Sequence, residues 1–220
     1  MHSTPNSASK TALFDEMFSS NGVMRNQYRE IAAQLLALPV EVLLQKQREA
    51  ETLFRRLGIT FAVYGEESGA ERLIPFDIVP RVFSAEEWSR LERGLKQRVR
   101  ALNAFLHDIY HDQEIIRAGV IPAHQVLGNS LYRPEMEGIN LPNQVYAHIA
   151  GIDLVRVAEN DFYVLEDNLR TPSGVSYMLE NRKTMMRLFP DLFAGYSVAP
   201  VEHYPQVLLD TLREAAPPHG

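Results

Sequence analysis

The sequence predicts a mixed α/β (α+β) fold in which pairs of antiparallel strands pack with helices. Long segments repeat apolar side chains every three or four residues, as amphipathic helices do. Shorter segments rich in β-branched and aromatic residues occur in two pairs, each separated by a turn-forming stretch. Of the 220 residues, 45% are hydrophobic and 23% are charged, which is ordinary for a globular protein with a sizeable core.

Two consecutive helices are predicted near the N-terminus. Residues 25–38 alternate polar and apolar side chains with helical spacing until Pro39 breaks the pattern. Residues 40–57 repeat the pattern, and Gly58 follows as a typical helix-terminating residue.

The longest predicted helix begins at a capping box. Ser84 can accept a hydrogen bond from the backbone of Glu87, and the Glu87 side chain can bond back to the backbone of Ser84. Seven apolar side chains follow on one stripe, and we expect them to pack in the core. The stripe comprises Trp88, Leu91, Leu95, Val99, Leu102, Phe105 and Ile109. Two further helices are expected over 175–188 and 201–215, with a mixed linker after Pro190.

Two strand pairs are predicted from β-branched and aromatic runs. The first pair comprises residues 59–64 and 71–76, which flank a glycine-containing loop. The second pair comprises residues 145–155 and 162–166, joined by a turn over 158–161. We expect each pair to form an antiparallel hairpin.

Charge and composition exclude several classes of function. The net charge is -6, with 22 Lys and Arg against 28 Asp and Glu, which argues against a general nucleic-acid-binding surface. There are no cysteines, so disulfides, thiolate zinc sites and thiol nucleophiles are excluded. No apolar run approaches the roughly 20 residues that span a bilayer. Residues 1–12 are small and polar, unlike a signal peptide, so we expect a disordered tail and a cytoplasmic protein without a membrane partner.

Oxygen-bearing side chains gather in the second predicted hairpin. Glu166 and Asn168 are two residues apart on a strand and share a face, whereas Asp167 points the other way. Hairpin pairing can return Glu166 beside Asp153 of the preceding strand. Two carboxylates and an amide oxygen would then converge, and such ligands suit Mg²⁺. The alternative is that Asp153, Glu166 and Asn168 are simply exposed polar residues of a hairpin.

The residues just after this hairpin suit an anionic ligand. Arg170 carries a planar guanidinium that could reach a phosphate or a carboxylate, or could instead pair with Asp167 or Glu180 on the surface. Ser173 and Gly174 precede a predicted helix, so their backbone N–H groups and the helix N-terminus offer an anion site.

Two other places carry candidate functional side chains. Arg133 lies in a loop over 129–143 and is either a substrate contact or an anchor for that loop. His107 and His111 are four residues apart on a predicted helix, as some zinc ligands are, but no third ligand is evident. Helix-surface polarity is the simpler interpretation of this pair.

Several short motifs along the chain form a recognisable set. They are Phe14-Asp15-Glu16-Met17, Tyr64-Gly65-Glu66-Glu67, Ile74-Pro75-Phe76-Asp77, Leu106-His107-Asp108-Ile109-Tyr110, Tyr132-Arg133-Pro134-Glu135-Met136 and Leu165-Glu166-Asp167-Asn168. These motifs resemble the circularly permuted ATP-grasp family, which is similar to glutathionylspermidine synthetases, and the resemblance covers most of the chain. The order of an acid on one strand, Glu-x-Asn on the next, a basic residue and a Pro/Gly turn also resembles the metal-binding end of ATP-grasp enzymes.

The resemblance implies an ATP-grasp-like antiparallel sheet with packed helices, circularly permuted and here incomplete. It also implies an ATP- and Mg²⁺-dependent carboxylate–amine ligase that forms an amide through an acyl phosphate. The expected ligands are therefore ATP and a small carboxylate and amine or a peptide-like substrate. By resemblance, the metal ligands would be Asp153, Glu166 and Asn168. Arg170 would contact the reacting phosphate, with Ser173 and Arg133 as further cofactor-binding residues.

One family element is not found in this sequence. ATP-grasp enzymes place strand-borne lysines over the nucleotide phosphates, but the four lysines here lie in the N-terminal tail and in predicted helices. In the permuted order the clamp would lie beyond residue 220, so we expect an N-terminal segment that turns over little alone and needs a C-terminal part of the same protein. These lysines are Lys10, Lys46, Lys96 and Lys183.

The sequence also predicts a division of the chain. Residues 1–12 form the tail, 13–125 a helical or α+β region, 126–200 the metal-binding hairpin portion, and 201–220 a helix and linker. Two other functions remain open. One is a non-catalytic ATP-grasp-like module that binds a peptide-like ligand or a protein, and the other is a metal-dependent hydrolase that uses the acidic cluster with the two histidines.

Overall fold

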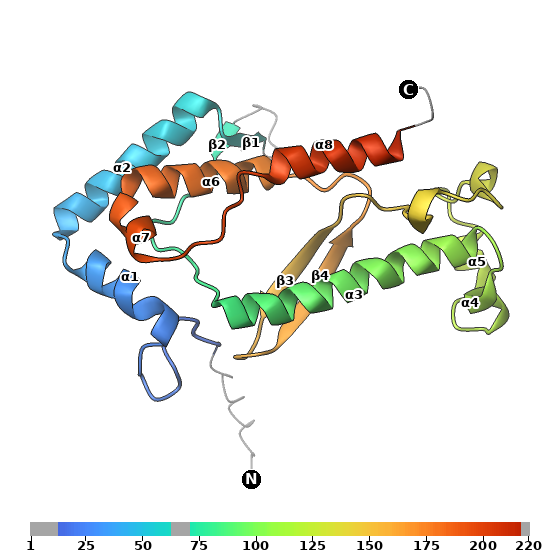
Figure 1. The fold of residues 1–220 in the computed structure, drawn as a ribbon, viewed down its shortest axis with the longest axis horizontal. Coiled ribbons are helices and arrows are strands. Elements are labelled where there is room, and N and C mark those ends of the chain that lie inside the picture. Colours follow the sequence, from blue (N-terminus) through green and yellow to red (C-terminus); the bar gives the residue numbers. More distant parts are fainter. Residues whose placement is uncertain (1–12, 63–70, 217–220) are drawn as a thin grey trace, which may run out of the picture.

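The computed structural model describes residues 13–62 and 71–216 (Figure 1). Helices and short antiparallel strand pairs alternate along the chain, so the predicted mixed fold class is confirmed. Within the described ranges, no helix is both long and apolar enough to cross a membrane. The elements in chain order are α1 (Asn26–Leu36), α2 (Val40–Leu57), β1 (Thr60–Ala62), β2 (Glu71–Leu73), α3 (Ala85–Ile109), α4 (Glu114–Arg117), α5 (Ala123–Val126), η1 (Pro134–Met136), η2 (Pro142–Gln144), β3 (Gly151–Arg156), β4 (Phe162–Asn168), α6 (Val175–Leu188), α7 (Pro190–Gly195) and α8 (Tyr204–Ala215).

Local sequence signals correctly predicted several element boundaries. Helices α2 and α6 have the predicted bounds, and α2 ends at Gly58, whose positive φ of 67° is a left-handed conformation that favours glycine. Both hydrogen bonds of the predicted capping box are present at Ser84, which begins α3. β1 and β2 pair antiparallel as expected, but the second strand ends at Leu73 instead of residue 76. The predicted loop between them lies outside the described residues.

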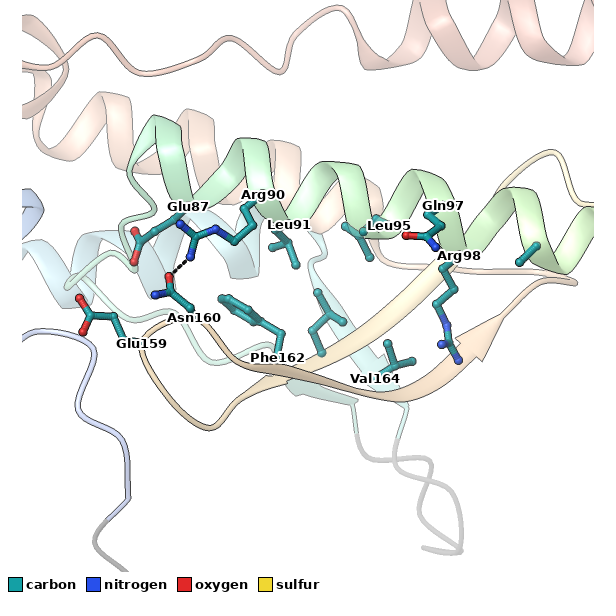
Figure 2. Close-up of a pocket in the computed structure, with 13 residues that line it drawn as sticks. Glu87, Arg90, Leu91, Leu95, Gln97, Arg98, Glu159, Asn160, Phe162 and Val164 are labelled. Carbon is teal, nitrogen blue, oxygen red and sulfur yellow. Dashed lines mark hydrogen bonds between the residues drawn. The ribbon is translucent and has the colours of Figure 1, made fainter.

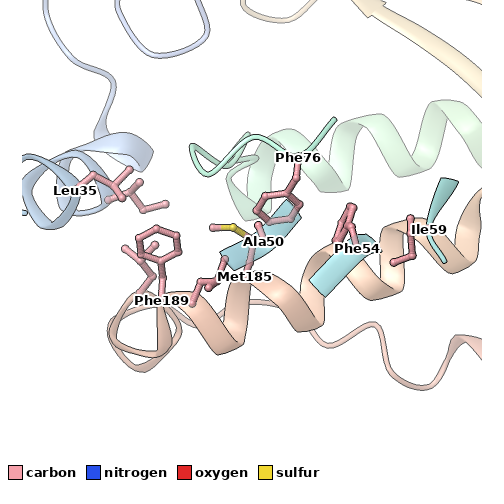
Figure 3. Close-up of a cluster of buried hydrophobic side chains, with 10 residues drawn as sticks. Leu35, Ala50, Phe54, Ile59, Phe76, Met185 and Phe189 are labelled. Carbon is pink, nitrogen blue, oxygen red and sulfur yellow. The ribbon is translucent and has the colours of Figure 1, made fainter. Parts of the chain in front are cut away.

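The buried core joins both ends of the chain. It combines side chains of α1 and α2 with side chains of α6 and α7, and residues around β1 and β2 close it (Figure 3). Phe54 is 0% exposed and meets Phe76 edge-to-face, with 5.1 Å between ring centroids. The buried members of this core are Ile31, Leu35, Ala50, Phe54, Ile59, Phe76, Met185, Leu188, Phe189 and Leu192.

Three further expectations from the sequence are wrong. Pro190 does not lead into a linker but starts α7, because proline is well tolerated in the first turn of a helix. Residues 145–150 form no strand, and β3 begins only at Gly151. The apolar stripe of α3 is only partly covered: Trp88 is 50% exposed, and of its seven members only Ile109 is buried.

The incomplete burial of α3 follows from what lies against it. The β3–β4 hairpin crosses α3 at an angle in Figure 1, and strands of 6 and 7 residues are too short to cover a helix of 25 residues along its length. A cavity of about 470 Å³ separates the two (Figure 2). Its apolar lining comes from both sides: Leu91, Leu95, Leu154, Phe162 and Val164.

Candidate metal-binding site

The β3–β4 hairpin brings the predicted metal ligands to one face. Asp153 pairs directly with Glu166, and Gly151 pairs directly with Asn168, in an antiparallel register. Residues directly opposite in such a pair point to the same side of the sheet, and Glu166 and Asn168 are two positions apart on β4. The register therefore places Asp153, Glu166 and Asn168 side by side on one face of the hairpin.

A β-bulge in β4 determines that the predicted ligands face away from α3. Leu154 pairs with Val164 while Asp153 pairs with Glu166, so Leu165 is an extra residue without a partner on β3. Strict alternation would place Glu166 on the same face as Val164, which lines the cavity against α3. The extra residue shifts the alternation by one position, so Glu166 points away from α3.

Both carboxylates on this face lack a counter-charge among the residues that the structure describes. Asp153 and Glu166 are exposed, and neither makes a hydrogen bond or an ion pair with any residue in the described ranges. Two carboxylates directly opposite each other repel unless a cation or a proton lies between them. The oxygen-only set of two carboxylates and one amide therefore fits a hard divalent cation, which would complete its shell with water or phosphate oxygens.

The described part of the chain holds no metal-binding cluster of histidines and acids. Within the described ranges, no group of three or more His, Cys, Asp or Glu side chains is placed to hold a metal ion. His107 and His111 stack with 4.0 Å between ring centroids, and their Nδ1 atoms contact Tyr146 Oη at 3.2 Å and the His107 carbonyl at 2.9 Å. The histidine pair is thus engaged in local packing, and it gives the hydrolase interpretation no support.

Aspartate 167 lies on the opposite face and is tied to α3. Arg98 donates two hydrogen bonds to its carboxylate, Nε to Oδ1 at 2.7 Å and Nη2 to Oδ2 at 2.6 Å. The hydrogen bonds from Arg98 lower the pKa of Asp167, and the carboxylate in turn raises the pKa of Arg98. Asp167 is consequently not available as the surface partner that the sequence suggested for Arg170.

Arg170 follows the hairpin with its guanidinium unpaired among the described residues. Its other suggested partner, Glu180, pairs with Lys183 at 2.6 Å. Glycine at position 151 lets the chain after β4 pass close by, because a Cβ there would lie 2.8 Å from the Cβ of Pro172. Arg170, two residues beyond Asn168, is exposed. Its guanidinium is therefore accessible to a ligand.

The start of α6 also has unused donors. Gly174 precedes the helix with φ of 93°, and no side chain caps the first turn. Ser173 is exposed and makes no hydrogen bond within the described ranges. The first N–H groups of α6 therefore stay available to an anion, as the sequence predicted on general grounds.

Arg133 is not brought to the hairpin by any described contact. It lies just before η1, where its backbone N–H donates to Tyr110 Oη at 3.3 Å. Tyr110 stacks on Tyr132, with 5.0 Å between ring centroids. Burial and then a hydrogen bond to Glu137 raise the pKa of Tyr132 to about 12. A ligand-binding role of Arg133 stays a prediction.

Sequence reasoning missed a buried cation at the turn end of the hairpin. The Arg156 side chain is 2% exposed and pairs with Glu87 of α3 at 2.5 Å. Its guanidinium lies 4.8 Å from the ring centre of Phe14 and 5.3 Å from that of Phe162. Glu16 lies 4.0 Å away and forms a second ion pair. The Phe14-to-Met17 motif thus belongs to a network that anchors the hairpin turn.

Comparison with known proteins identifies the family of this chain. The profile of a family described as a circularly permuted ATP-grasp matches residues 80–220, a range that holds α3, the hairpin and α6 to α8. This chain belongs to the circularly permuted ATP-grasp family. The expected family, and with it the ATP-grasp-like fold class, is therefore confirmed.

Curated relatives of this ATP-grasp chain are much longer than the chain itself. An uncharacterized protein of Mycobacterium tuberculosis is 50% identical over 92% of the chain, which covers 36% of that protein. An uncharacterized protein of Synechocystis is 45% identical over 94% of the chain and 43% of that protein. A Frankia alni protein named as a candidate glutamate–cysteine ligase is 40% identical over 93% of the chain and 24% of that protein. The chain thus spans well under half of each of these relatives.

Proposed function

We propose that this chain is the metal-binding segment of an ATP- and Mg²⁺-dependent carboxylate–amine ligase. The observation that carries the proposal is the direct cross-strand pairing of Asp153 with Glu166 on an exposed face, without a counter-charge within the described ranges. Family membership supports ATP-dependent chemistry. The names of the Frankia relatives support an amide-forming reaction between a carboxylate and an amine.

The reaction of this class has two steps. The substrate carboxylate attacks the γ-phosphorus of ATP, forming an acyl phosphate and releasing ADP. The amine then attacks the acyl carbon, an amide forms, and inorganic phosphate leaves with the former carboxylate oxygen. Both steps pass through states with negative charge on the transferred phosphoryl group, so the protein must supply compensating charge.

Residues of β3 and β4 and those that follow β4 would divide this task. A divalent cation held at this face would offset charge on the phosphates of ATP. Asp153, Glu166 and Asn168 would hold it through their oxygens. Arg170 would bind the transferred phosphoryl group through its planar fork, and the N–H groups at Ser173 and the start of α6 would donate to a phosphate oxygen.

The rest of a longer protein would complete the site. The lysines within the described ranges, Lys46, Lys96 and Lys183, all lie in helices, so no strand-borne lysine of these ranges faces the proposed metal. Beside the carboxylates, Tyr163 and Leu165 are 65% and 69% exposed on the hairpin. We propose that the nucleotide clamp comes from further polypeptide of the kind the relatives carry, and that it covers this face.

The test is amide synthesis by the complete protein with ATP, Mg²⁺ and pooled carboxylates and amines. Glu166→Gln and Asp153→Asn should each lower the rate by ~100-fold or more, because loss of the metal removes several kcal/mol of charge stabilisation. Phosphate release measures the rate, and mass spectrometry identifies the amide product. Asp161→Asn, which changes an exposed carboxylate at the hairpin turn, is the matched control.

Other results would redirect the proposal. Unchanged turnover in Glu166→Gln would remove the metal assignment. Binding of a peptide-like ligand without any ATP turnover by the wild type would instead identify a non-catalytic module.

A further inference from the structure

The bulge in β4 decides which side chains of this strand face the proposed cation. In the observed register, Leu165 is unpaired and Glu166 points away from α3. If the bulge closed, the residues after it would move by one position along β3. A slip of one residue turns every side chain to the other face, so Asp167 would face the metal side and Glu166 and Asn168 would face α3.

An ion pair between α3 and β4 is compatible only with the observed register. Asp167 immediately follows Glu166 and precedes Asn168, and its carboxylate receives both hydrogen bonds of the Arg98 fork, at 2.7 and 2.6 Å. Such bidentate contacts constrain orientation as well as distance. Figure 2 shows Arg98 extending from α3 toward the end of the hairpin that carries the proposed ligands.

We propose that Arg98 and Asp167 are positioning residues that hold β4 in its bulged register and thereby aim Glu166 and Asn168 at the cation. The inference rests on the proposed function, since it assigns the direction of metal ligands. The ion pair is partly exposed, so solvent screens much of its stabilisation, and the fold depends mainly on the buried core. Loss of the ion pair should therefore weaken metal binding far more than folding.

The experiment titrates the complete protein with Mn²⁺ and follows free Mn²⁺ by electron paramagnetic resonance. Arg98→Ala should lower Mn²⁺ affinity by about 10- to 100-fold, the range typical of residues that orient metal ligands. Its unfolding midpoint should stay near that of the wild type. Arg100→Ala, which removes an exposed arginine of the same helix that makes no ion pair within the described ranges, should change neither quantity.

Exchange of the two charges separates positioning from a general structural role. The double variant Arg98→Asp with Asp167→Arg keeps the summed side-chain length and the opposite charges, so it should recover most of the lost affinity. Wild-type affinity in Arg98→Ala, or a loss that the double variant does not restore, would overturn the inference. Wild-type Mn²⁺ affinity in Glu166→Gln would instead overturn the proposed metal site itself.

Discussion

At the scale of single residues, the buried charge of Arg156 is surrounded by several partners. Arg156 has a Glu87 carboxylate, the carbonyls of Ala158 and Glu159, and two aromatic faces around its guanidinium. A buried cation would be costly without such partners, because desolvation penalises the charged form. The proposed metal ligands differ from Arg156 in both respects. Asp153 and Glu166 are exposed, and they have no charged partner among the described residues.

The acids around Arg156 predict a pH dependence of stability. Hydrogen bonds from Arg81 lower the pKa of Glu16, while burial of Glu87 is outweighed by hydrogen bonds from Ser84 and Arg156, which also lower its pKa. Because both folded-state pKa values lie below the usual 4.5, the stabilisation is fully present above that value. It is lost as the pH falls through the folded-state values.

Urea unfolding at a series of pH values measures this effect. The free energy of unfolding should fall as the pH drops below about 4.5, and Glu16→Gln should flatten the decline. Glu114→Gln, at an exposed i,i+3 pair with Arg117, serves as the comparison and should leave the slope unchanged. The same slope in Glu16→Gln and the wild type would contradict the interpretation.

At the scale of elements, the sequence predicted helix ends that are set by nearby residues. It did not predict the bulge that decides which side chains of β4 share a face. The capping box at Ser84 and the left-handed Gly58 depend on residues within a few positions, so sequence pattern indicates them. The bulge at Leu165 depends on which side chains meet α3, and the alternation of β4 alone does not indicate it. Even so, the prediction that Glu166 and Asn168 oppose Asp167 agrees with the observed register.

Removal of the capping box should measurably weaken α3. Ser84→Ala deletes the acceptor for the Glu87 N–H and should cost about 1 kcal/mol of unfolding free energy. Ser89→Ala, within the same helix, should cost nothing or slightly stabilise it, because alanine has the higher helix propensity. Chemical denaturation of the two variants compares them, and an equal loss in both would exclude a capping contribution.

At the scale of the whole molecule, one core connects distant parts of the sequence. Phe54 of α2 packs within the same cluster as Met185 and Leu188 of α6 and Phe189 at the start of α7. The Nζ of Lys46 also donates to the carbonyl of Leu188. The boundaries inferred from the sequence at residues 125 and 200 stay a prediction, and this core lies across both regions they define.

Truncation in this core should loosen both regions together. Phe54→Ala should cost about 3–5 kcal/mol, from lost burial and the cavity that remains. Amide exchange should then accelerate in α6 as well as in α2. Leu44→Ala, at an exposed position of the same helix, should cost well under 1 kcal/mol and leave exchange in α6 unchanged. Protection retained in α6 of Phe54→Ala would show that the two regions unfold independently.

The sequence by itself determined the helices with strong periodicity, the two hairpins, and the pairing of an acid on one strand with Glu-x-Asn on the next. These features depend on spacing and caps within a few residues. Its short motifs also resemble the family to which the chain belongs. Only the tertiary structure decided the bulge at Leu165, the Arg98–Asp167 pair and the buried environment of Arg156. The two arginine environments depend on contacts between residues about 70 positions apart, and the bulge is seen only in the pairing of the two strands. A pattern within a few residues carries no information about such contacts or about this pairing.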